Sequence, residues 1–282
     1  MRSLDLLGRF ASEMGVNVWF RRGGYLLLAP DDRHIPRLQE NIEVQRPSGM
    51  RTRIISRTEA CEIVPQLDLG RVRAASRNAD DGVLFPWPFL WGYAGRPGAQ
   101  AATVRTFTEV TGFDSAGARI RAVETTAGRV ACDTVVNAAG AWSPGLASLA
   151  GVALPDRPTR HEILVTEPLK SWLDPLVSLL GTGLCLSQSR RGDIVGGMGD
   201  PGELAGLHPG STLRFLACFS RILTGLAPLT RPLRVMRQWA GSCEVTPDNN
   251  PILGAAGPGN FLRPTMNRFA RPGAPREEFI IG

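Results

Sequence analysis

The stretch Val135-Val136-Asn137-Ala138-Ala139-Gly140-Ala141-Trp142-Ser143 says more about the fold than any other part of the 282-residue sequence. Two β-branched residues end a predicted strand, small residues form a turn, and Ser143 with Pro144 predicts the start of a helix through Leu149. Ligand sites of α/β sheets lie at the carboxyl ends of strands, and small residues let a ligand approach the backbone. Tight packing of the strand on the helix explains the same residues, so the spacing alone leaves both interpretations open.

Outward from this turn, the sequence predicts a mixture of strands and helices. Upstream, the runs 104–111, 119–125 and 129–136 predict a meander whose last strand is Thr134-Val135-Val136. Apolar spacing and capping signals, among them the capping box from Ser56 to Glu59, predict helices at 3–14, 33–44, 57–64, 86–94 and 212–223. Further strands are predicted at 16–20, 24–29, 161–166, 183–187, 193–197 and 233–239. The pattern predicts an α+β or α/β fold.

Composition excludes several classes of protein. Apolar residues make up 43% of the chain and charged residues 21%, a balance typical of globular domains rather than disordered or fibrous chains. The five cysteines form no CxxC pair, so neither a disulfide framework nor a zinc ribbon is expected, and a reduced, cytoplasmic setting is the default. The uncharged run 175–189 is too short and too polar for a membrane span.

The formal net charge of +6 does not point to nucleic acid. Lys170 is the only lysine, and the arginines are spread along the whole chain. Nucleic-acid binders concentrate basic residues on one face or stripe, so no nucleic-acid partner is expected. A basic protein that binds anionic surfaces stays open as an alternative.

The remaining motifs carry little chemistry. Gly197-Met198-Gly199-Asp200-Pro201-Gly202 has GxGxxG spacing, but Pro201 argues against the helix that a dinucleotide site needs, so we interpret it as a loop. The chain has no GxSxG elbow and no HExxH pair. His161 lies on a predicted strand, where a lone histidine is more often structural than catalytic. The sequence therefore identifies no catalytic residue and no metal site.

Five segments, in this order, resemble the FAD-dependent oxidoreductases of the D-amino-acid oxidase superfamily, in the branch of the sarcosine oxidase β subunits. They are residues 20–26, 81–82 with 86–93, 108–112, 135–143 and 237–254, and residues 166–169 and 187–197 also match. The resemblance implies a partial, Rossmann-like FAD-binding domain and an antiparallel-sheet substrate domain. It implies FAD-binding roles for Val110, Ala138, Ala139, Gly140 and Trp142.

The resemblance also implies a chemistry and a division of the chain. The implied reaction moves a hydride from a C–H bond next to nitrogen to the flavin, and the protein supplies placement and electrostatics. Residues 1–80 are expected to belong mainly to the substrate domain, and 81–150 to the FAD-binding domain. Residues 151–235 return to the substrate domain, 236–254 to the FAD-binding domain, and 255–282 are expected to form an irregular tail.

The chain departs from the family pattern at both ends and at single positions. The family opens with a strand, a GxGxxG turn and a helix, and this sequence begins after them, so we expect roughly 90 to 110 residues to be missing. The family's final flavin-contacting segment has no match after Gly254, and 95–100 is off-pattern for a helix. Cys243 stands where some amino-acid oxidases have a carboxylate-binding arginine, and no histidine near Asp81 matches a covalent flavin link.

These observations give three hypotheses. The first is an incomplete FAD-dependent amine or amino-acid oxidase or dehydrogenase, which binds FAD weakly or not at all without its missing half. The second is a non-catalytic substrate-domain module, or remnant, that needs a partner subunit to supply the cofactor-binding half. The third is the basic anionic-surface binder. For the first two, we expect a small amine or amino acid as the substrate and an aggregation-prone or oligomeric product.

Overall fold

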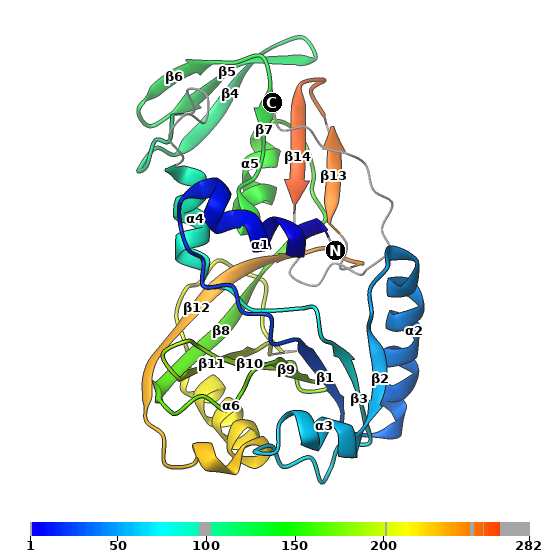
Figure 1. Ribbon diagram of the computed structural model, residues 1–282. Helices are drawn as coiled ribbons and strands as arrows, with labels where there is room; N and C mark the ends of the chain where they lie inside the picture. Colours follow the sequence, from blue (N-terminus) through cyan, green and yellow to red (C-terminus); the bar gives the residue numbers. More distant parts are fainter. Residues whose placement is uncertain (1, 96–102, 201, 249–250, 256, 266–282) are drawn as a thin grey trace. The chain divides into compact units, whose positions relative to one another are not determined.

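The computed structural model describes residues 2–95, 103–200, 202–248, 251–255 and 257–265, and the chain divides into two compact units (Figure 1). Unit 1 contains Met1–Ala102, His161–Pro201 and Gly210–Ala240, and unit 2 contains Thr103–Arg160, Gly202–Pro209 and Gly241–Gly282. The predicted mixed α and β fold is confirmed. Residues 81–102, which we expected beside 103–150, fall in unit 1. The assignment of substrate and cofactor roles to these parts stays a prediction.

An eight-stranded sheet forms the centre of unit 1, in the order β12-β8-β11-β10-β9-β1-β3-β2. Its strands are β1 (Tyr25–Ala29), β2 (Arg53–Ser56), β3 (Ala74–Asn78), β8 (Arg157–Pro168), β9 (Leu176–Leu179), β10 (Leu184–Gln188), β11 (Asp193–Met198) and β12 (Val235–Val245). Strands β1 and β9 run parallel, whereas β11 pairs antiparallel with both β8 and β10. The sheet is therefore largely antiparallel, as the resemblance implied for a substrate domain.

The helices of unit 1 follow the sequence signals closely. They are α1 (Arg2–Met14), α2 (Ile35–Gln45), α3 (Arg57–Ile63), α4 (Pro86–Ala94) and α6 (Leu213–Leu226), with short 3-10 turns at Asp32–His34, Arg46–Ser48 and Pro228–Thr230. The capping box before α3 is confirmed, because the Ser56 hydroxyl accepts from the Glu59 N–H while the Glu59 carboxylate accepts from the Ser56 N–H. Helices α1 and α4 pack through Phe10, whose ring lies where a Cβ of Gly92 would be.

The main core lies between the sheet and the helices α3 and α6, which Figure 1 shows on the same side of the sheet. Residues from both helices join the strand residues in one buried apolar cluster; among them are Leu26, Ala60, Val177, Ile194 and Phe219. The amphipathic spacing of α6 explains this packing, because its apolar stripe faces the sheet.

One expectation about the strands of unit 1 was wrong, and three of its strands were not predicted. Residues 16–20 form no strand, because Trp19 adopts a positive φ of 52°, which an extended strand excludes. Strands β2, β3 and β9 were not predicted, since arginines and alanines interrupt the apolar pattern of the first two. These strands complete the sheet on either side of β1.

Unit 2 contains two three-stranded sheets, β4-β5-β6 and β13-β14-β7. Their strands are β4 (Val110–Ala116), β5 (Arg119–Thr125), β6 (Gly128–Ala131), β7 (Val135–Val136), β13 (Ile252–Ala255) and β14 (Phe261–Thr265). A meander is present, but it ends at β6, and its first strand starts only at Val110. The expected last strand of the meander was wrong, because β7 leaves it and pairs in parallel with β14.

The end of the chain differs from the expected irregular tail. Phe261–Thr265 forms β14, which pairs with both β7 and β13. The Asn260 side chain secures this arrangement, because it bonds both backbone groups of Ile120 and the carbonyl of Asp133. Residues 266–282, and 96–100 of the off-pattern segment, lie outside the described residues.

The helix after the small-residue turn starts at Ser143, one residue earlier than it would if Ser143 were its N-cap. A 3-10 turn, Gly140–Trp142, leads into α5 (Ser143–Leu149), whose N-cap residue is Trp142. Ser143 was expected to cap this helix, and that expectation was wrong. Its backbone is already helical, and its buried hydroxyl makes no hydrogen bond among the described residues.

Candidate functional site

One face of the eight-stranded sheet carries half-buried side chains rather than a closed core. The strand registers place five residues of this face in a single row: Leu27, Ser178, Cys185, Gly197 and Ile163. A second row, two residues away on each strand, contains Tyr25, Leu176, Ser187, Val195 and Val165. These ten residues define the half-buried face; Gly197 is buried, the other nine are half-buried, and none of the ten is Asp, Glu, Lys or Arg.

The opposite face of the same strands is fully packed. Its matching row consists of Leu26, Val177, Leu186, Gly196 and Leu164, all buried. A Cβ on Gly196 would lie only 2.5 Å from the ring of Phe219, so α6 packs directly against the backbone there. Because this face is closed by α6, only the half-buried face can receive a small molecule over the middle of the sheet.

Two hydroxyl groups meet on the half-buried face. The Tyr25 Oη donates a hydrogen bond to Ser178 Oγ, with 2.9 Å between the oxygens. Burial raises the pKa of Tyr25, although the bond to Ser178 works in the opposite direction. The phenol therefore stays protonated near neutral pH and acts as a donor. The Ser178 hydroxyl then keeps its own proton for a further acceptor.

His161 lies at one border of the half-buried face. A Cβ on Gly197 would come within 3.0 Å of His161 Nε2 and 2.5 Å of the Glu162 carbonyl oxygen. Only glycine fits at position 197 while the buried imidazole takes that space. Gly197 belongs to the same row as Ser178 and Cys185. The structure thus places His161 at the end of this row, next to the glycine.

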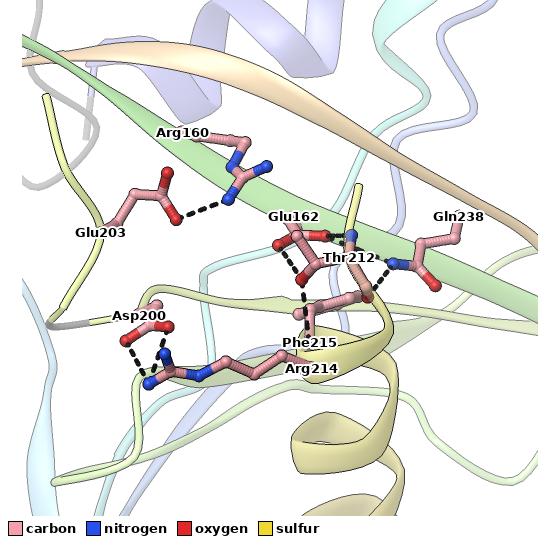
Figure 2. Close-up of polar contacts among 8 residues, drawn as sticks. All are labelled: Arg160, Glu162, Asp200, Glu203, Thr212, Arg214, Phe215 and Gln238. Carbon is pink, nitrogen blue, oxygen red and sulfur yellow. Dashed lines mark hydrogen bonds and ion pairs between the residues drawn. The ribbon is translucent and has the colours of Figure 1, made fainter. Parts of the chain in front are cut away.

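Glu162, the next residue, points to the packed face and serves the helix rather than a ligand (Figure 2). Its carboxylate is buried and accepts hydrogen bonds from the Thr212 N–H, from the Thr212 hydroxyl at 2.8 Å and from the Gln238 amide. The Thr212 hydroxyl in turn accepts from the Phe215 N–H and caps α6. A carboxylate at a helix N-terminus is stabilised by the helix dipole, so these contacts explain the buried charge without a catalytic role.

Two ion pairs drawn in Figure 2 are structural as well. In unit 2, the largely buried side chains of Arg160 and Glu203 pair at 2.8 Å. In unit 1, Asp200 and Arg214 pair at 3.2 Å with more exposure to solvent. The second pair links the loop after β11 to the first turn of α6.

The residues that the resemblance assigned to FAD occupy two places in unit 2. Ala138, Ala139, Gly140 and Trp142 lie together in the turn after β7, with the Trp142 side chain exposed and Gly140 at a φ of +54°. Buried Asn137 holds this turn, since its amide donates to the Ser143 carbonyl and its oxygen accepts from the Ala139 N–H. Val110 begins β4, in the other sheet of the unit.

The turn can accept a flat or extended group against its backbone, since its residues are small. A Cβ on Gly140 would meet only the Glu244 carboxylate, at 3.5 Å, so that carboxylate lies beside the turn. Sequence reasoning did not single out Glu244, and Cys243 before it is half-buried on β12. These residues fit the flank of a dinucleotide cofactor.

A cradle for a diphosphate, by contrast, is not found in the part of the chain that the structure describes. Such a cradle needs a glycine-rich turn that opens a helix. The GxGxxG stretch does not provide it. Its first glycine, Gly197, lies inside β11 and is crowded by His161, and the next helix starts only at Leu213. The described residues therefore fit part of an FAD site and not its phosphate-binding part.

Sequence reasoning missed the polar residues of the half-buried face. Strand alternation places Tyr25 with Leu27, and Cys185 with Ser187, but it cannot show that β9 lies between these two strands. Ser178 stands in an uncharged run that we considered only as a possible membrane segment. To find this face, the sequence would have had to show which distant strands are neighbours in the sheet.

Two kinds of feature are absent from the described residues. None of the described helices combines the length and the apolar character that a membrane span requires. Within the same residues, no three His, Cys, Asp or Glu side chains gather in a way that could hold a metal ion.

Comparison with known proteins gives a consistent picture. A family model described as FAD dependent oxidoreductase (DAO) matches residues 1–264. The sarcosine oxidase subunit beta of Rhodobacter capsulatus is 28% identical over 256 residues, which cover 89% of this chain and 62% of the relative. The chain thus spans less than two thirds of the length of that relative.

Solved structures resemble the chain over almost its whole length. The L-proline dehydrogenase from P. horikoshii has a TM-score of 0.87 and 33% identity, covering 96% of this chain and 73% of that one. The glycine oxidase from Geobacillus kaustophilus has a TM-score of 0.84 at 20% identity, with the same two coverages, which shows a shared fold.

Proposed function

The chain belongs to the DAO family of FAD dependent oxidoreductases, and from this premise we propose that it acts in the oxidation of an amine or amino acid at the C–H bond next to nitrogen. The observation that supports this proposal most strongly is the family match over residues 1–264. The names of the relatives, which include sarcosine oxidase subunit beta, D-amino acid dehydrogenase and glycine oxidase, point to the same class of substrate.

FAD is the cofactor of this family, and when bound it supplies the two-electron acceptor for the oxidation. We propose that Ala138, Ala139, Gly140 and Trp142 line one flank of FAD, with Val110 contacting its adenine side. The turn is suited to this because Asn137 fixes its shape and small residues leave the backbone accessible. The proposed contribution of unit 1 is the half-buried face, which holds and orients the substrate.

The phosphate-binding part of the site is proposed to come from further polypeptide. The described residues contain no glycine-rich turn that opens a helix, and the relatives are longer than this chain. Several relatives are named as subunits, such as hydrogen cyanide synthase subunit HcnC of Pseudomonas aeruginosa, which supports a partner subunit. The same observation favours the second candidate function, a substrate-domain module without activity of its own.

Flavin retention and bleaching test both parts of the proposal. The chain is incubated with FAD and desalted, alone and as a fusion to a strand, GxGxxG turn and helix of the dinucleotide-binding type. We expect a flavin absorbance band only in the fusion that carries the phosphate-binding unit, and we expect anaerobic addition of L-proline, sarcosine or glycine to bleach it.

Each outcome decides one point. A stoichiometric flavin in the unfused chain would refute the need for further polypeptide. A flavin-loaded fusion that none of these compounds bleaches would refute the proposed oxidation and leave the module interpretation.

A further inference from the structure

We propose that the Ser178 hydroxyl, held in place by Tyr25, binds the carboxylate of an amino-acid substrate on the half-buried face. The inference rests on the proposed function and adds the substrate class and the residues that select it. Its starting point is the 2.9 Å bond from Tyr25 Oη to Ser178 Oγ, which joins β1 to β9 across the middle of the sheet. Tyr25 is the positioning residue, and Ser178 is the group that contacts the substrate.

The direction of this bond decides what Ser178 can bind. Since the tyrosine donates, the serine oxygen is occupied as an acceptor and its proton is directed to another partner. The lone pair of the substrate nitrogen favours loss of hydride from the neighbouring carbon, and a hydrogen bond to that lone pair would oppose this. The Ser178 hydroxyl is therefore better placed as a donor to the carboxylate. A hydrogen bond to an ionised acceptor is also stronger than one to a neutral group.

The surroundings of Ser178 suit an anion. Cys185 lies directly across from it on β10 and adds a weak S–H donor. The ten residues of the half-buried face include no acidic side chain; the Asp81 carboxylate, whose charge contributes to the raised pKa of Tyr25, is not among them. Burial keeps Tyr25 protonated, as its raised pKa indicates, so the pair stays neutral.

Position 243 provides no arginine for a carboxylate. The resemblance aligned this position with a carboxylate-binding arginine, and a half-buried cysteine stands there. A thiol cannot make the two parallel hydrogen bonds of a guanidinium. Recognition through Ser178 supplies the carboxylate with a donor of a different kind, on another strand.

Paired ligands with and without a carboxylate test the inference. Binding of L-proline and pyrrolidine, and of sarcosine and dimethylamine, is measured by saturation-transfer NMR on the full chain. We expect Ser178→Ala to weaken binding of L-proline and sarcosine about tenfold, the loss of one hydrogen bond to a charged group. Tyr25→Phe should weaken it several-fold, and Ser178→Thr, which keeps the hydroxyl, should restore most of it.

The two ligands without a carboxylate should bind all variants equally. Ser220→Ala on α6 and Tyr93→Phe on α4 are matched controls of the same chemistry away from the half-buried face, and they should behave as the wild type. Thermal melts establish that each variant is folded, and the threonine variant decides the case if alanine is not tolerated.

Three results would overturn the inference: unchanged L-proline binding in Ser178→Ala, an equal loss for pyrrolidine, or no binding of either carboxylate ligand. These readouts need no turnover. A fusion that retains flavin but is not bleached would therefore defeat the proposed function while leaving the carboxylate contact standing. If the fusion turned over these compounds but Ser178→Ala bound L-proline as well as the wild type, the carboxylate contact would be refuted and the proposed function would stand.

Discussion

Replacing Glu162 by alanine should strongly destabilise unit 1. The buried carboxylate accepts three hydrogen bonds, two from Thr212 and one from the Gln238 amide (Figure 2). A buried donor left without an acceptor costs about 1–3 kcal/mol, and partial entry of water reduces the sum, so we expect a loss of about 3–5 kcal/mol in the free energy of unfolding. Glu162→Gln keeps an amide oxygen for the two N–H donors, and its loss should be about 1 kcal/mol.

Urea unfolding followed by far-ultraviolet circular dichroism measures both variants, with the midpoint converted through the slope of the transition. Glu43→Ala is the matched control, because Glu43 pairs with Arg46 on the surface and should contribute less than about 0.5 kcal/mol. If Glu162→Ala shifted stability by less than about 1 kcal/mol, or if glutamine were as harmful as alanine, the capping role of the carboxylate would be wrong.

Three further outcomes are expected. Gly196→Ala should destabilise unit 1 by about 1–3 kcal/mol in urea unfolding, because its Cβ would lie 2.5 Å from a core phenylalanine ring, whereas Gly225→Ala on α6, with nothing within 4 Å, should be neutral or stabilising. Hydrogen bonds from an arginine and from the α3 cap lower the pKa of Glu59 to about 2, so its contribution to stability is present above pH 4.5 and is lost as pH falls toward 2; an acid titration of Glu59→Gln should lack that loss. Replacing Trp87 and Trp91 by serine should reduce self-association in light scattering, because both side chains are more than half exposed on α4, and an unchanged particle mass would contradict this.

Local signals in the sequence predicted local structure well. The serine and glutamate of the capping box fixed the start of α3, and Pro86 marked the first residue of α4. The segment after Gly23 was predicted as a strand and forms β1. In each case the physical cause lies within a few residues of the position that it determines.

Pairing between distant strands could not be predicted from these signals. Val135 and Val136 follow the meander directly, yet they pair with β14, whose residues come more than a hundred positions later. Likewise, Tyr25 and Ser178 are 153 residues apart, so neither strand pattern could show that their hydroxyls meet. The small-residue turn could be singled out because its residues are consecutive, whereas the half-buried face comes from five strands.

The single side chain of Asn260 also sets an order of events during synthesis. Its amide bonds Ile120 and Asp133, which leave the ribosome well before it, the former 140 residues earlier. The core formed by Ile120, Val135 and Phe261 cannot close until that late segment emerges. At typical rates of chain elongation, of roughly 5–20 residues per second, the meander waits about 7 to 28 seconds with an open apolar side. A nascent chain arrested before Asn260 should therefore recruit chaperones to this meander, while one released just after β14 should not.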